Sequence, residues 1–206
     1  MRKLLVLLLV LAMSLIAIAA SAHLTGKKIC LDPGHGGSDP GAVGQGLYED
    51  NINLDITNRA YTVLVNDAAS VKRTRSTDVY VSLQGRCDIA NNWGANRFES
   101  SHCNAYNGSA HGTETYCYSG GSANSYDLRN HVNPEMVAHM GTTNRGVKTA
   151  DFYVLIHTVM PAILCEVAFI DNAGDAAKLG SATYRQLAAR AYLHGTQSHY
   201  GVAPHG

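Results

Sequence analysis

Short apolar runs alternate with segments of helical periodicity along most of the chain. Strands are expected at 28–31, 71–75, 97–103, 113–118, 152–155 and 162–167, and helices over 51–66, 82–92, 123–141 and 183–200. The helix over 123–141 is expected to be interrupted near Pro134, because proline removes a backbone donor. Strands interleaved with helices predict one α/β domain, with a twisted, mostly parallel or mixed sheet covered by helices on both faces.

The first 22 residues have the pattern of an export signal. Arg2 and Lys3 are followed by an apolar stretch, which ends in small residues at 20–22. A membrane anchor is the alternative, since about 17 apolar residues stand at the low end of what spans a bilayer. We expect cleavage of residues 1–22 and a catalytic domain over 23–206 that is secreted, to the cell wall or periplasm. No stable membrane insertion is expected after the signal is removed.

Composition and charge narrow the range of functions. The chain of 206 residues is 46% hydrophobic and has zero formal net charge, which excludes overall disorder and argues against a nucleic-acid binder. Export makes the five cysteines possible disulfide partners, and fifteen arrangements of two bridges remain open. For Cys30 and Cys165, which stand in apolar strand-like runs, a buried thiol is the favoured interpretation.

Candidate chemistry stands where the predicted strands end. His35 lies in a glycine-rich segment directly after the first strand, Glu49 begins the following helix, and His102 is near the end of a later strand. Two histidines and one carboxylate are a ligand set typical of catalytic zinc. Glu166 ends another apolar strand, where a raised pKa would suit general acid–base work. With ten histidines in the chain, this spacing alone supports zinc only in part.

Several motifs carry a more specific resemblance. Residues 31–42 (LDPGHGGSDPGA), 46–49 (GLYE), 90–95 (ANNWGA) and 160–170 (MPAILCEVAFI) occur in this order. They resemble the zinc-dependent N-acetylmuramoyl-L-alanine amidases of the amidase type 3 family, and the chain is most similar to the cell-wall hydrolases of spore-forming bacteria. The resemblance covers about Lys28 to Tyr200 and implies a single α/β domain.

The resemblance also implies a site and a reaction. Zinc would be held by His35, Glu49 and His102, with Glu166 as the catalytic glutamate. The implied substrate is peptidoglycan, cut at the amide between the lactyl group of N-acetylmuramic acid and L-alanine of the stem peptide. Zinc would polarise the carbonyl and activate water, while Glu166 would move the proton. A monomer is expected, with no nucleic-acid partner.

Three features depart from the family pattern. Strand alternation places Arg97, Glu99 and Ser101 on one face, where family members mostly carry aliphatic residues. A buried Glu99 would need a partner such as Arg97, or a wetter face. Ile156 stands where the family commonly has arginine, and Val167-Ala168 where Asn-Gly often follows the glutamate. The last two departures, at Ile156 and at Val167-Ala168, bear on substrate binding and on turn geometry.

Two other functions remain open at this point: an exported zinc peptidase that cuts between amino acids, and a catalytically impaired wall-binding homologue. If Glu166 is not the base, Glu114 is the next candidate, although a structural or substrate-contact role is favoured for it.

Some members of the resembling family carry an inserted helix that lies across the zinc site and inhibits the enzyme. The loops 104–110 and 119–125 of this chain are too short for such an insertion. The helix over 123–141 is therefore expected to pack on the sheet and leave an open, constitutively active groove.

Overall fold

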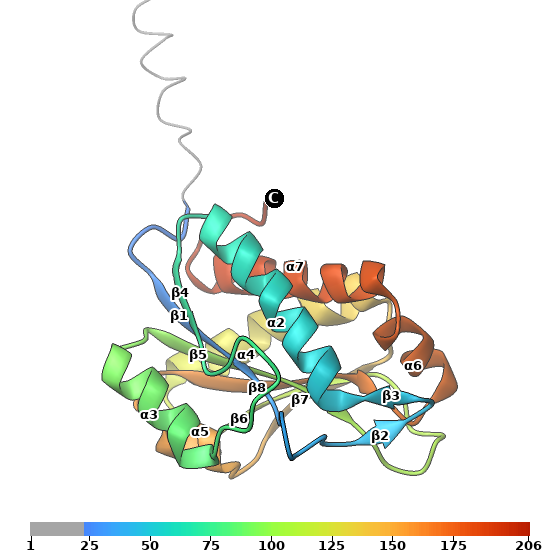
Figure 1. The fold of residues 1–206 in the computed structure, drawn as a ribbon. Helices are drawn as coiled ribbons and strands as arrows, with labels where there is room; N and C mark the ends of the chain where they lie inside the picture. The colour runs from blue at the N-terminus through green and yellow to red at the C-terminus, as the bar shows by residue number, and fades with distance from the viewer. Residues whose placement is uncertain (1–22) are drawn as a thin grey trace, which may run out of the picture.

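The computed structural model describes residues 23–206, so the predicted export signal at 1–22 lies outside the described residues. A six-stranded sheet forms the centre of the fold, in the order β4-β1-β5-β8-β6-β7. A small hairpin of β2 and β3 stands apart from it (Figure 1). The strands are β1 (Lys28–Pro33), β2 (Val43–Gly44), β3 (Leu47–Tyr48), β4 (Ser70–Arg73), β5 (Arg97–Asn104), β6 (Thr113–Cys117), β7 (Asn144–Thr149) and β8 (Ala162–Phe169).

The sheet is mixed. Strands β4, β1, β5 and β8 pair in parallel, and β6 pairs antiparallel with β8 and parallel with β7. The helices are α2 (Glu49–Asn66), α3 (Leu83–Trp93), α4 (Ala123–Met140), α5 (Tyr153–His157), α6 (Ala173–Leu179) and α7 (Ala182–His199). The predicted α/β class is confirmed, with helices on both faces of the sheet.

Two apolar cores hold these layers together. The larger core joins one face of the sheet to α2, α4 and α7, which lie together on that side in Figure 1. The smaller core joins the opposite face to α3 and α5, with Phe98 and Leu164 from the sheet. Residues of alternating strand positions therefore enter different cores, since successive side chains point to opposite faces.

Two predictions about local structure are wrong. The run Phe152–Leu155, expected as a strand, lies mostly in the short helix α5, whose Val154 and Leu155 are buried against the smaller core. Helix α4 continues through Pro134. Pro134 lies on the exposed side of that helix, while Leu128, Val132 and Met136 anchor the opposite side in the larger core.

One expectation about helix packing is confirmed, and the structure adds elements that the sequence did not predict. The packing of α4 on the sheet confirms the role expected for its apolar positions. The hairpin β2–β3, the edge strand β7 and helix α6 were not predicted. The cysteines form no disulfide in the described structure, and all five are buried free thiols. Among residues 23–206, no helix has the length and apolar character needed to cross a bilayer.

Candidate active site

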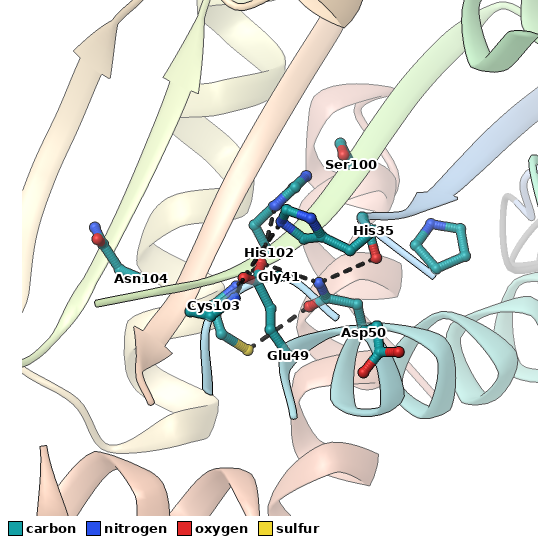
Figure 2. Close-up of polar contacts among 12 residues, drawn as sticks. His35, Gly41, Glu49, Asp50, Ser100, His102, Cys103 and Asn104 are labelled. Carbon is teal, nitrogen blue, oxygen red and sulfur yellow. Dashed lines mark hydrogen bonds and ion pairs between the residues drawn. The ribbon is translucent and has the colours of Figure 1, made fainter. Parts of the chain in front are cut away.

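His35, Glu49 and His102 come together from three separate elements. His35 follows β1, Glu49 is the first residue of α2, and His102 lies in β5. His35 Nε2 is 3.3 Å from Glu49 Oε2, and His102 Nδ1 is 3.0 Å from Glu49 Oε1. Figure 2 shows the two rings next to one another near Glu49. They meet edge to face, at an interplanar angle of 77° and with ring centroids 4.9 Å apart. The structure thus brings together the three residues predicted to bind metal.

The glycine-rich segment after β1 makes this approach possible. A Cβ atom on Gly34 would stand 2.3 Å from the His102 ring, so only glycine leaves room for that ring. Gly41 has φ +65°, and a Cβ there would stand 2.6 Å from both Glu49 Oε2 and the His35 ring. His35 itself has φ 60°, a conformation that costs a non-glycine residue free energy and that is concentrated at functional sites.

Each side chain of the trio is held by further hydrogen bonds. His35 Nδ1 donates to Asp39 Oδ2 at 2.9 Å, which directs Nε2 toward Glu49. Glu49 accepts from the backbone amides of Ala42 at 2.8 Å and Cys103 at 3.0 Å. Carboxylate contacts to the second nitrogen of a ligating histidine are typical of metal sites, because they fix the tautomer and the ring orientation.

The charges of the trio are coupled. Burial alone would raise the pKa of Glu49, but hydrogen bonds from His102 and then His35 hold that pKa well below its usual range. Burial lowers the pKa of His35, yet the hydrogen bonds and charges of Glu49 and Asp39 outweigh it and raise the pKa to about 9. Glu49 is therefore an anion that attracts positive charge at this point, as a metal ligand must.

Two buried arginines, which the sequence analysis did not single out, hold the backbone that carries His35. Arg75 donates to the carbonyl oxygens of Pro33 at 3.1 Å and Gly34 at 2.9 Å. Arg86 donates to the carbonyl of His35 at 2.7 Å and to the buried carboxylate of Asp32 at 2.8 Å. These contacts satisfy carbonyl groups that no strand partner reaches, and they fix the strained segment.

Glu166 lies in the cavity that His35 and His102 also line. In the sheet register it is the direct partner of His102, so both side chains are on the same face. A cavity of about 420 Å³ is lined by His35, His102 and Glu166, with Tyr80 and Phe152 among its apolar walls. Burial raises the pKa of Glu166 to about 7, although His102 acts in the opposite direction. Its Oε2 atom is buried and has no hydrogen-bond partner within the described structure.

Glu114, the alternative base, is surrounded differently. Its Oε1 accepts from Asn104 at 2.8 Å and from the Tyr116 hydroxyl at 2.7 Å, while its Oε2 accepts from Arg145 at 2.8 Å and from Lys148. Burial would raise its pKa, but these donors, Lys148 foremost, lower it. A carboxylate with both oxygens engaged by donors is a poor proton acceptor, which fits the structural role favoured for Glu114.

The departures from the family pattern are accommodated locally. Glu99 is fully buried and accepts from the Thr196 hydroxyl at 2.8 Å. It does not pair with Arg97, which instead donates to His199 Nε2 at 2.6 Å. Val167 and Ala168 are buried and continue β8 past the glutamate. Ile156 lies on α5 and is 39% exposed.

The trio is one of four His–carboxylate groups with the spacing of a metal site in the described part of the chain. Two donors at about 2.0–2.1 Å from a tetrahedral zinc ion lie roughly 3.3 Å apart. His35 Nε2 is 3.3 Å from one oxygen of Glu49, and His102 Nδ1 is 3.0 Å from the other. The donor set therefore fits zinc. Within this group, His35 and His102 line the cavity that also holds the partnerless buried carboxyl oxygen of Glu166.

Comparison with known proteins identifies related amidases. The family model described as N-acetylmuramoyl-L-alanine amidase matches residues 29–198. The N-acetylmuramoyl-L-alanine amidase LytC of Bacillus subtilis is 45% identical over 86% of this chain, which spans 36% of that protein's length. The sporulation-specific N-acetylmuramoyl-L-alanine amidase of the same organism is 40% identical over 85% of this chain and 69% of its own length.

A solved structure is similar throughout the fold. The catalytic domain of CwlV, an N-acetylmuramoyl-L-alanine amidase from Bacillus (Paenibacillus) polymyxa, superposes with a TM-score of 0.81. It is 32% identical in sequence, and the match covers 85% of this chain and 99% of that domain. The similarity therefore extends over the mixed sheet, its helices and the elements that position the trio.

Proposed function

The chain belongs to the N-acetylmuramoyl-L-alanine amidase family, and from this premise we propose that it is a zinc-dependent peptidoglycan hydrolase. It cuts the amide between the lactyl group of N-acetylmuramic acid and L-alanine of the stem peptide. The observation that carries the proposal is the convergence of His35, Glu49 and His102, two of which line one cavity with Glu166.

In this proposal His35 Nε2, His102 Nδ1 and a Glu49 carboxylate oxygen hold zinc. When bound, zinc supplies Lewis-acid polarisation of the scissile carbonyl and lowers the pKa of a water molecule. Asp39 keeps the proton of His35 on Nδ1, so that Nε2 presents its lone pair to the ion. The anionic Glu49 offsets part of the metal charge within a largely buried setting.

Glu166 manages the proton. Its carboxylate accepts a proton from the attacking water and delivers it to the leaving amine nitrogen, as a general base and then a general acid. A pKa raised by burial to about 7 suits both steps near neutral pH. Apolar side chains, Tyr80 and Phe152 among them, line the cavity around this exchange.

We place the working protein at the cell wall. Residues 1–22 act as a cleaved export signal and residues 23–206 form the catalytic domain, which acts as a monomer on peptidoglycan. Because α4 packs on the sheet rather than across the cavity, the groove is open and the enzyme needs no activating partner.

Digestion of purified wall by residues 23–206 alone tests the proposal. We expect new N-terminal L-alanine, loss of release on chelation, and recovery on adding zinc. His102→Ala should lose turnover, whereas His111→Ala, in an exposed loop outside the cavity, should keep it. Other new amino termini would indicate a peptidase, and wall binding without release would indicate a binding module. Activity only after a partner protein is added would contradict the open groove.

A further inference from the structure

A second His–carboxylate–His cluster lies where the two ends of the described chain meet. His23 precedes β1, Asp67 follows the last residue of α2, and His205 is in the tail after α7. Figure 1 shows the C-terminus close to the start of the coloured chain, beside the end of α2. We call these three residues the terminal cluster. The family motifs do not include it, and the proposed reaction makes no use of it.

Its three potential ligand atoms converge on one point. His23 Nδ1 is 2.6 Å and His205 Nε2 is 3.0 Å from the same oxygen, Asp67 Oδ1. The two nitrogens are 3.4 Å apart, which matches the spacing of roughly 3.3 Å between donors on a tetrahedral zinc ion. An ion would fit if Asp67 Oδ1 withdrew by less than about 1 Å.

The contacts of His205 direct its Nε2 atom toward Asp67. Its Nδ1 atom is 2.9 Å from the carbonyl oxygen of Ala203 and 3.3 Å from Gln197 Nε2. Its Nε2 atom is 3.0 Å from Asp67 Oδ1. When Nδ1 donates its proton to the Ala203 carbonyl, Nε2 has a lone pair that can bind a metal ion beside Oδ1.

The surroundings hold the cluster in place as an outer shell does in metal sites. Asp67 is 5% exposed, and its other oxygen, Oδ2, accepts from Gln197 Nε2 at 3.1 Å and from the Leu24 amide at 3.3 Å. The Gln197 side-chain oxygen accepts from the His205 amide at 3.1 Å. These contacts occupy Oδ2 and aim Oδ1 at the two imidazoles.

The two remaining clusters are less suited to a cation. In the group of Asp127, His131 and His199, the guanidinium of Arg97 already donates to His199 Nε2. In the group of Glu135, His139 and His194, ligation through His194 Nδ1 would leave a proton on Nε2, which is buried without a partner.

We propose that His23, Asp67 and His205 bind a divalent transition-metal ion of the class that prefers imidazole and carboxylate, such as zinc. The ion joins the two ends of the catalytic domain and stabilises the native state by mass action. If residues 1–22 are cleaved, as proposed above, His23 becomes the first residue, and its α-amine lies within chelating reach of a metal on Nδ1. That amine is the fourth ligand.

Zinc titration of metal-stripped protein that begins at His23 tests the site. Elemental analysis should find two zinc ions per chain in the wild type and one each in His205→Ala, His23→Gln and His102→Ala. His194→Ala, the matched control in a neighbouring cluster, should keep two. Two ions in His205→Ala, or one in the wild type, would overturn the terminal site without affecting the proposed catalytic centre.

Thermal unfolding in the His102→Ala background isolates the terminal cluster. Zinc should raise the melting temperature of His102→Ala, and adding His205→Ala should abolish that rise; an equal rise in both would contradict the proposal. Two glycines placed before His23 keep the imidazoles but move the α-amine. They should weaken zinc binding at the terminal cluster, and unchanged affinity would remove the amine from the ligand set.

Discussion

Glu166 and Glu99 lie on adjacent strands, β8 and β5, and burial raises the pKa of each to about 7. Each also has one buried oxygen, Oε2, with no hydrogen-bond partner in the described structure. They point to opposite faces of the sheet. Glu166 lines the cavity with His35 and His102, whereas Glu99 is beneath α7 and accepts from Thr196.

The difference shows that a perturbed pKa does not by itself identify a base. Burial of a carboxyl group produces the same shift in a packed core as in an active site. What separates Glu166 is its setting: it lines an open cavity, and its cross-strand neighbour is His102 of the candidate metal trio. Glu99 has the proton affinity of a base without access to anything it could deprotonate.

The largest effect that tests this comparison is expected from Glu166→Gln. Removing the proton acceptor should lower wall hydrolysis by about 100- to 10,000-fold, the usual worth of a positioned base. Zinc content and wall binding should persist, because the trio is intact. Glu99→Gln is the matched control and should retain turnover. A normal rate in Glu166→Gln would mean that another group moves the proton.

Much of the site could be predicted because its residues stand at strand ends in distinctive local sequences. His35 and Glu49 fall within or beside glycine-rich motifs, Glu166 ends an apolar run, and His102 is near the end of a predicted strand. Arg75 and Arg86 could not be predicted in the same way. Arg75 is 42 residues away from the carbonyl of Pro33 that it holds, so its contact depends on tertiary packing.

The fold shows the same division between local pattern and tertiary context. Long helices such as α2 and α7 were predicted from their spacing to within two residues at each end. The short run around Val154 predicts a strand but forms a helix, since periodicity cannot separate short apolar strands from short helices. Strand β7 has no buried residue to mark it and is defined by its pairing with β6.

A smaller effect, on stability rather than turnover, is expected from Glu99→Gln. Because burial raises the pKa of Glu99 from 4.5 to about 7, the folded protein binds its proton more tightly than the unfolded chain does. Wild-type stability from this group is fully present below pH 4.5 and is lost as pH rises through 7. The loss should total about 3 kcal/mol, and the variant should not show it.

Urea unfolding at pH 5 and pH 8 measures this difference. The free energy of unfolding of Glu99→Gln, relative to the wild type, should be higher at pH 8 than at pH 5. Equal pH dependence in both proteins would show that Glu99 ionises in the core without cost. Glu99 would then lack the raised pKa that it is expected to share with Glu166.

The smallest effect is expected from Asp39→Asn, which acts on the proposed metal site beside Glu166 without touching the proposed base. Asp39 Oδ2 accepts from His35 Nδ1 at 2.9 Å, and this contact selects the tautomer that presents Nε2 to Glu49. An asparagine can turn its amide donor toward the ring and favour the wrong tautomer. Outer partners of this kind are worth roughly 10- to 100-fold in metal affinity or activity. Zinc affinity and turnover should therefore fall together by that factor, and saturating zinc should restore most of the rate. Loss of turnover with zinc affinity unchanged would instead assign Asp39, which lines the cavity, a part in substrate binding.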